Sequence, residues 1–371
     1  MALTSSLLFT IIIIIAFPVS TTAQQSSNRN ITLGSSIVAN ADASHTWTSP
    51  SGEFAFGFRQ VAPGAFLLAI WFDQLPDKTL VWSANRDAPV PTGSTVQLST
   101  DGSLVLIHQR SGGIWRADPS QPARVAYAAM LDTGNFVLAT NISSILWGSF
   151  DQPTDTLLPT QLLNRDVALV STVSETNYST GKFRMRLQTD GNLVLNTVAF
   201  PSPDPYWSSQ TQTLESGVRL LFNQSGSIIF IRQNGTLIRP LFNNSDLVGQ
   251  FHQRLTLEYD GVLRRYVYPK SANSSMAFAW TARGFVPSNI CHDVREAHTG
   301  GGACGFNSIC KMEADGRPSC GCPPGYSSRG GLAGCAPNFA PHRCDQQSED
   351  AQDFIFEDIY NIDWPEVDIE V

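Results

Sequence analysis

The chain has 371 residues, of which 42% are hydrophobic and 15% charged, so it can form the cores of two or three domains. Its formal net charge is −8, from 24 basic and 32 acidic side chains. Ten of the acidic side chains and no basic one lie in residues 345–371, so the rest carries 22 acidic against 24 basic residues, a balance of +2. A nearly neutral body argues against nucleic acid or an anionic membrane as the partner.

The first 23 residues have the features of a secretory signal peptide. Residues 7–19 form a 13-residue apolar core, and the small residues at 21–23 suit cleavage before Gln24. The apolar core is shorter than the roughly 20 residues of a membrane helix, and no later segment qualifies as one. We therefore expect a secreted, extracellular chain as given.

Two further patterns agree with export. Candidate N-glycosylation sequons of the form Asn-x-Ser/Thr occur at Asn30, Asn141, Asn177, Asn223, Asn234, Asn243 and Asn273. All seven cysteines fall between Cys291 and Cys344, which is typical of a disulfide framework in an oxidising compartment.

A repeated turn-and-strand pattern runs through residues 24–285. Its clearest copy is Gln188-Thr-Asp-Gly-Asn-Leu-Val-Leu-Asn196, in which Asp-Gly predicts a tight turn and the following apolar residues a strand. Looser copies centre on Gly52, Gly102, Gly134, Gly226 and Gly261. Gly102 and Gly134 are 32 residues apart, and Gly191, Gly226 and Gly261 follow at intervals of 35. Such periods predict two sets of three repeated β-units.

The intervening residues are also typical of an all-β protein. Residues 54–58, 66–72 and 79–82 are predicted strands, and no long helical period is present. Trp47, Trp71, Trp82, Trp115 and Trp147 are expected to fill the centre of the first β-domain. The proline-punctuated stretch 147–162 is expected to be an ordered crossing to a second β-unit.

From Cys291 the composition changes to that of a small disulfide-rich module. Six cysteines follow the spacing Cys291-x12-Cys304-x5-Cys310-x9-Cys320-x-Cys322-x12-Cys335, which matches an epidermal-growth-factor-like module. The sequence alone allows 15 pairings. Cys344 has no partner in this pattern.

Enzyme and metal functions find little support. Gly300-Gly-Gly-Ala-Cys-Gly305 fits a nucleotide-loop pattern but follows no predicted strand and precedes no predicted helix. No kinase, hydrolase or zinc-protease motif occurs. His292, His298 and His342 lie near cysteines, but disulfides explain those cysteines better than zinc. We expect no catalytic site, metal or cofactor.

The order of three motifs resembles the ectodomain of plant G-type lectin S-receptor-like serine/threonine kinases. These motifs are Val81-Trp-Ser-Ala-Asn-Arg-Asp87, Ser149-Phe-Asp-Gln-Pro-Thr-Asp-Thr-Leu-Leu-Pro159 and the six-cysteine module. The resemblance implies tandem bulb-type lectin units of the β-prism II fold, in which three four-stranded sheets surround a pseudo-threefold axis. It also implies the disulfides Cys291–Cys310, Cys304–Cys320 and Cys322–Cys335.

The implied domain order covers the whole chain. It comprises a signal peptide (1–23), a first bulb-type lectin domain (24–155), a second lectin-like or S-locus-glycoprotein-like unit (156–285), an epidermal-growth-factor-like module (286–340) and the start of a PAN-like region (341–371). Full-length members of the family continue through a membrane helix and a cytoplasmic kinase at the plasma membrane, which are expected to be absent here.

Mannose-binding relatives use the pattern Gln-x-Asp-x-Asn-x-Val-x-Tyr, whose five side chains point to one face of a strand. The copy at 188–196 keeps four, namely Gln188, Asp190, Asn192 and Val194, with Asn196 in place of Tyr. Loss of the Tyr hydrogen bond costs about 0.5–1.5 kcal/mol. Two weaker candidates keep Asp101 with Val105 and Asn135 with Val137. An alternative remains that Asp190 only caps its turn.

The leading hypothesis is a carbohydrate-binding (mannose-type) or ligand-sensing region of a receptor-like kinase in defence or recognition signalling. The alternative is a protein-interaction module without sugar affinity, which forms a homodimer or binds a peptide and acts as a soluble receptor form or decoy.

Overall fold

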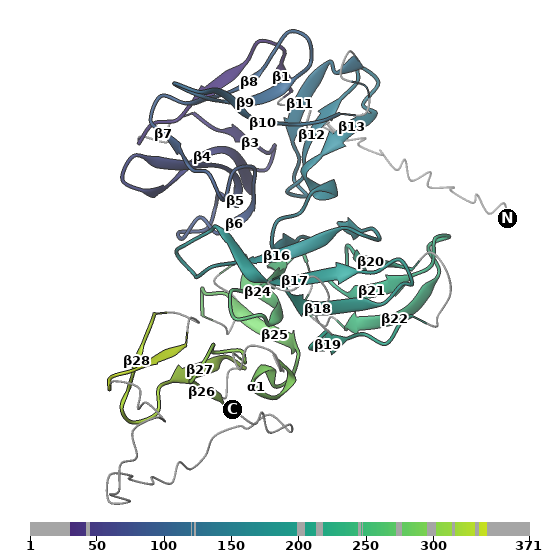
Figure 1. Cartoon of the computed structure of the whole chain (residues 1–371). Coiled ribbons are helices and arrows are strands. Elements are labelled where there is room, and N and C mark those ends of the chain that lie inside the picture. Colours follow the sequence, from purple (N-terminus) through teal and green to yellow (C-terminus); the bar gives the residue numbers. More distant parts are fainter. Residues whose placement is uncertain are drawn as a thin grey trace, which may run out of the picture.

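The computed structural model describes residues 30–41, 45–119, 121, 124–198, 205–212, 218–243, 246, 248–271, 277–294, 302–313, 316–330 and 334–339. The predicted signal peptide at 1–23, the acidic region at 341–371 with Cys344, and Asn273 lie outside the described residues. Almost every described element is a strand (Figure 1).

The first unit consists of three antiparallel sheets. Sheet A has the order β1 (Ile31–Thr32), β11 (Tyr127–Met130), β12 (Phe136–Ala139) and β13 (Ile145–Gly148). Sheet B has the order β10 (Gly112–Arg116), β9 (Leu104–His108), β8 (Thr95–Leu98) and β2 (Ser36–Val38). Sheet C has the order β3 (Trp47–Thr48), β4 (Phe54–Ala62), β5 (Ala65–Phe72) and β6 (Leu80–Ser83), with β7 (Val90–Pro91) beside β5.

The second unit repeats the arrangement after a short 3-10 turn, η2 (Ser149–Asp151). Sheet D has the order β14 (Thr156–Leu157), β23 (Phe251–Leu257), β24 (Leu263–Pro269) and β25 (Thr281–Val286). Sheet E has the order β15 (Leu162–Leu163), β20 (Arg219–Phe222), β21 (Ile228–Ile231) and β22 (Leu237–Phe242). Sheet F has the order β16 (Ala168–Thr172), β17 (Thr180–Leu187), β18 (Leu193–Thr197) and β19 (Trp207–Ser208).

The repeated glycines each serve one sheet. Each lies at positive φ in the turn before one inner strand, at Gly52 (sheet C), Gly102 (B), Gly134 (A), Gly191 (F), Gly226 (E) and Gly261 (D). At Gly261 a side chain is doubly excluded, because φ is +84° and a Cβ would lie 2.7 Å from the Phe183 ring. The predicted two sets of three β-units are thus confirmed as two three-sheet prisms.

Alternation along the strands sends one face of each sheet into a prism core. In β5, Phe66, Leu68, Ile70 and Phe72 pack in the first core, whereas Trp71 lies in a separate cluster on the outer face. The expectation that Trp71 fills the centre is therefore wrong. Trp71 is offset by one residue from the core-facing set, and its Nε1 donates to Asp73 at 2.8 Å. The other four tryptophans do pack against the first core.

Polar contacts join the two prisms. Arg86 donates to the carbonyl oxygens of Val170 and Ser171, which covers the edge strand β16. Asp87 accepts from both the backbone N and the Oγ1 of Thr180, each at 2.6 Å. Trp280 packs against the first core, and its Nε1 donates to Thr79 Oγ1 at 2.7 Å.

The C-terminal module begins at the four-residue helix α1 (Ile290–Asp293) and contains two short hairpins. These are β26 (Ile309–Met312) with β27 (Pro318–Gly321), and β28 (Tyr326–Ser328) with β29 (Cys335–Pro337). The disulfides are Cys291–Cys310, Cys304–Cys320 and Cys322–Cys335, the pairing that the resemblance implies. Within the described part of the chain, no helix has the length and hydrophobicity that a membrane crossing requires.

Candidate carbohydrate-binding site

The hairpin between β17 and β18 in sheet F carries the four residues that match the mannose pattern. Its turn is closed by the backbone N of Gln188, which donates to the carbonyl oxygen of Asn192 at 2.8 Å. Gly191 N donates in turn to the carbonyl of Gln188 at 2.9 Å, with Gly191 at φ +88°. The turn is therefore the predicted Asp-Gly turn, and it fixes where the following side chains point.

Asp190 is exposed at the tip of this turn. Its Oδ1 accepts from the backbone N of Asn192 at 2.9 Å, so the turn-capping role left open by the sequence is real. Its second carboxylate oxygen has no partner among the described contacts. Gln188 is half-buried, and its side-chain amide likewise makes no described hydrogen bond. Both groups can therefore accept or donate to a ligand.

Asn192 is buried, and its Oδ1 accepts hydrogen bonds from other residues of the protein. It accepts from Ser209 Oγ at 3.1 Å and from Thr211 N at 3.3 Å, while Ser209 Oγ accepts from Leu193 N at 2.9 Å. Only the Nδ2 donor of Asn192 is left for another partner among the described residues.

The same Asn–Ser arrangement recurs in the first prism. Asn135 Oδ1 accepts from Ser149 Oγ and from Phe150 N, both at 3.1 Å. Sequence reasoning missed this bracing role of the asparagines. The signal was present as a Trp-x-Ser triplet after each copy, at Trp147-Gly-Ser149 and Trp207-Ser-Ser209.

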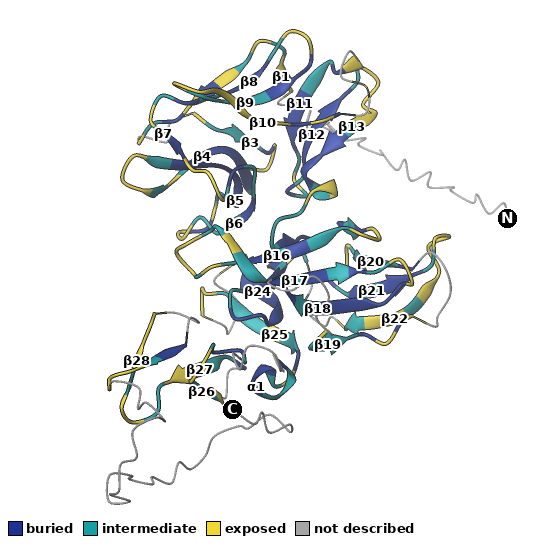
Figure 2. Cartoon of the chain, in the orientation of Figure 1, coloured by how far each residue is buried: buried dark blue, intermediate teal, exposed yellow. Residues whose placement is uncertain are grey.

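Val194 and Asn196 follow on the same outward face of β18. Val194 is only 1% exposed, which leaves little of it for contact with a sugar ring. Asn196, at the place of the missing Tyr, has a buried Oδ1 without a hydrogen-bond partner. In Figure 2, β18 is accordingly coloured mostly as buried, whereas Thr189 and Asp190 in the turn before it are exposed.

In the two weaker copies, candidate side chains form hydrogen bonds within the protein. At the first, Asp101 Oδ1 accepts from Ser99 Oγ and from Ser103 N, and Arg116 donates to Ser103 Oγ at 2.6 Å. Arg116 also lies directly opposite Val105. At the second, Asn135 is bonded as described, and Val137 is 2% exposed.

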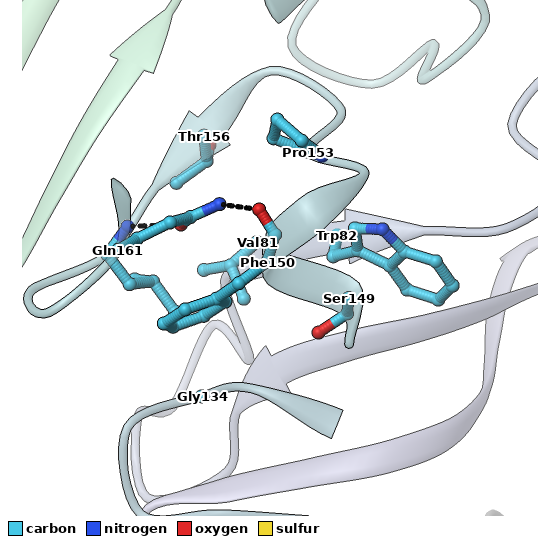
Figure 3. Close-up of a pocket in the computed structure, with 9 residues that line it drawn as sticks. Val81, Trp82, Gly134, Ser149, Phe150, Pro153, Thr156 and Gln161 are labelled. Carbon is cyan, nitrogen blue, oxygen red and sulfur yellow. Dashed lines mark hydrogen bonds between the residues drawn. The ribbon is translucent and has the colours of Figure 1, made fainter. Parts of the chain in front are cut away.

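A small cavity of about 10 Å³, enough for about one water molecule, lies at the crossing between the prisms (Figure 3). It is lined by Val81, Trp82, Gly134, Ser149, Phe150, Pro153, Thr156, Leu158 and Gln161. Gln161 closes it, because Nε2 donates to Phe150 O and Oε1 accepts from Leu158 N, both at 3.0 Å. The cavity is therefore part of the ordered crossing that the proline-rich stretch predicts.

No metal site is evident within the described residues. None of their His, Cys, Asp and Glu side chains form a group of three or more that could hold an ion. Of the predicted zinc candidates, His298 and His342 lie outside the described residues.

Comparison with known proteins places these features in a family. The D-mannose binding lectin model matches residues 79–179. The G-type lectin S-receptor-like serine/threonine-protein kinase LECRK3 of Oryza sativa subsp. indica is 39% identical over 92% of this chain and 44% of its own length. The corresponding kinase RLK1 of Arabidopsis thaliana is 32% identical over 94% of this chain and 44% of its own.

The chain belongs with the lectin regions of the G-type lectin S-receptor-like kinases. It spans less than half the length of these curated relatives. Its 371 residues contain no kinase motif, and the described part, almost entirely β-strand, contains no kinase domain. The lectin model and the receptor-like kinase relatives together support the interpretation of this chain as a carbohydrate-binding receptor ectodomain.

Solved lectins show a further likeness over about a third of the chain. The mannose-specific agglutinin from snowdrop (Galanthus nivalis) bulbs, complexed with methyl-α-D-mannoside, is 19% identical over 33% of this chain and 98% of its own, with a TM-score of 0.26. The Polygonatum cyrtonema lectin complexed with monomannoside is 24% identical over 33% of this chain and 97% of its own, also with a TM-score of 0.26.

Proposed function

We propose that the chain binds a mannose-type carbohydrate at the β17–β18 hairpin of sheet F. In this proposal the Gln188 amide, the free oxygen of Asp190 and Asn192 Nδ2 bond the sugar hydroxyls. The small exposed part of Val194 lies beneath the ring, and Asn196 Oδ1 accepts where the relatives have a Tyr. Planar polar groups above a small apolar floor are what a sugar with adjacent hydroxyls requires.

One observation supports this hairpin over the other two. Asp190 is exposed with one carboxylate oxygen unoccupied, next to an amide whose donor is also unoccupied. In the Asp101 copy, Ser103 takes the place of Asn192, and its hydroxyl already accepts a hydrogen bond from Arg116. At Asn135 the position of the acid is Thr133, so the carboxylate is missing.

The proposed setting is the extracellular side of the plasma membrane. The relatives are named as receptor-like kinases, and the described sequons other than Asn223 are exposed, as a secreted glycoprotein requires. In that setting the chain would sense a glycan in defence or recognition signalling. The alternative, binding of a peptide or homodimerisation without sugar affinity, is an outcome of the test below.

Retention on mannose resin tests the proposal, with Asp101→Ala as the matched control. Both aspartates cap the same kind of turn, at 2.9 Å and 3.1 Å, so both substitutions remove one turn cap. We expect the wild type and Asp101→Ala to be retained and Asp190→Ala to flow through. If the wild type is not retained, or if the two variants behave alike, the proposed site is wrong.

A further inference from the structure

Two arginines lie on the same face of sheet F as the proposed sugar site. In the register of β17 and β18, Arg186 is directly opposite Val194, and Arg184 is directly opposite Asn196. Directly opposite residues of an antiparallel pair project to the same face, with Cβ atoms about 5 Å apart. The outward face that follows Asn192 therefore carries two positive charges, both half-buried.

Neither guanidinium has a carboxylate or hydrogen-bond partner among the described contacts. The Nε of Arg186 is buried without a partner, and so is the neighbouring acceptor Asn196 Oδ1. Arg264, Arg219 and Arg254 of this unit also have a buried Nε without a partner, but each bonds through a terminal nitrogen, as Arg264 does to Glu258 and Asp260. Polar groups that are not fully exposed are normally satisfied, so two neighbouring guanidiniums without any described partner point to a ligand on this face.

We propose that this site takes an acidic sugar, a hexuronate, whose carboxylate is held by Arg186, while Arg184 holds the carboxylate of a second sugar in an oligouronate. The inference rests on the proposed function, because the hydroxyls of the same ring would bond Asp190 and Asn192. At about 3.3 Å per residue, Val194 and the opposing Arg186 lie about 7 Å beyond Asn192, within reach of the same ring.

Arg184 lies opposite Asn196, about 13 Å beyond Asn192, where a second sugar of an oligouronate would lie. A planar carboxylate suits the two-pronged hydrogen bonding of a guanidinium, and a hydroxyl can donate to Asn196 Oδ1. The carboxylate belongs at the arginine end, because at the turn it would be repelled by Asp190.

A matched pair of probes separates this inference from the proposed function. Methyl α-D-mannoside and methyl α-D-mannosiduronate share stereochemistry and differ only in oxidation at C6. Titration of each into the whole chain is expected to show about tenfold tighter binding of the uronate at low salt. This preference should shrink at high ionic strength, because the added attraction is between charges.

The double variant Arg184→Gln/Arg186→Gln should lose the preference for the uronate and keep mannoside binding. Arg239→Gln, an exposed arginine of sheet E with the same charge change, should keep both. Unchanged thermal unfolding of each variant shows that its fold is intact.

The outcomes are distinguishable. Equal or weaker uronate binding by the wild type overturns the inference and leaves the mannose proposal standing. Uronate binding without mannoside binding supports the inference and overturns mannose specificity. Binding of neither probe overturns both, and a preference that survives the double variant overturns the role of the arginines.

Discussion

The carboxylate of Glu53 in the first prism lies 2.9 Å from Nδ1 of His252 in the second, although 199 residues separate them. The other carboxylate oxygen accepts from Lys270 Nζ at 3.0 Å. Glu53 directly follows the first repeated glycine, Gly52, so one of the six turns also carries a contact between the prisms. His252 is 4% exposed and stacks edge-on against Phe72.

This contact predicts a pH-dependent stability. Burial alone would raise the pKa of Glu53, but the hydrogen bonds of His252 and Lys270 and the charge of Lys270 lower it below its ordinary value of 4.5. A depressed folded-state pKa means that the stabilisation is present above pH 4.5 and is lost as the pH falls through the folded-state value. The free energy of unfolding by urea, measured between pH 3 and 7, tests this pH dependence.

The variant Glu53→Gln should have a free energy of unfolding lower by about 1–3 kcal/mol at pH 7. Its stability should also fall less than that of the wild type below pH 4.5. Glu175→Gln, at an exposed glutamate of the second prism, serves as the control and should follow the wild type. Identical pH profiles for Glu53→Gln and the wild type would contradict this role.

Arg264 is predicted to be the most damaging single position at the junction with the C-terminal module. It is 1% exposed, donates to Glu258 Oε2 at 2.8 Å and Asp260 Oδ1 at 2.9 Å, and reaches Gly316 O in the module at 2.6 Å. Replacement by Ala leaves the buried Asp260 without its cationic partner, removes one of the two arginines that bond Glu258, and should cost about 3–5 kcal/mol.

Thermal unfolding and limited proteolysis check this prediction. In Arg264→Ala the protease should cut the chain between sheet D and α1 and so release the module. Arg317→Ala removes a partly exposed partner of the same Glu258 and should cost less. Equal effects of the two substitutions would show that burial of Arg264 is not the source of the stability.

Reduction of the disulfides should unfold the module and leave the first prism intact. All described cysteines are in three bridges of the module, and the first core contains none. A loop of about 15 residues contributes about 3 kcal/mol. The second prism should lose some stability, because Ile290, Val294 and Ala303 pack on its core.

Near-ultraviolet circular dichroism follows the packing of the first core during reduction. The tryptophans of that core contribute to the signal, namely Trp47, Trp82, Trp115 and Trp147. Their signal should persist in reductant while the module becomes sensitive to protease. Loss of the tryptophan signal on reduction would contradict independent stability of the first prism.

Local patterns predicted most of the fold from the sequence. The Gly turns and the strands at 54–58, 66–72 and 79–82 lie where short-range signals place them, because turn conformation and side-chain alternation are local properties. Contacts between distant segments were not predicted. The Glu53–His252 pair depends on how the prisms dock. The outward position of Trp71, in contrast, follows from its alternation with Ile70 and Phe72 in β5, which the sequence interpretation did not apply.

The candidate site was predicted in part. Its four residues do share one hairpin, but the sequence pattern treats Asn192 as a free ligand group. In the structure Ser209 and Thr211, which lie just after β19 (Trp207–Ser208), occupy its oxygen. Likewise, the pattern describes only one strand. It therefore could not predict that Arg184 and Arg186, on the neighbouring strand, lie beside the site.

Calorimetric titration of methyl α-D-mannoside into the whole chain tests the central claim most directly, because it counts sites. The account predicts one site per chain, absent in Asp190→Ala and unchanged in Asp101→Ala. Two or more sites per chain, or a single site that survives Asp190→Ala, would contradict the assignment of sugar binding to the β17–β18 hairpin.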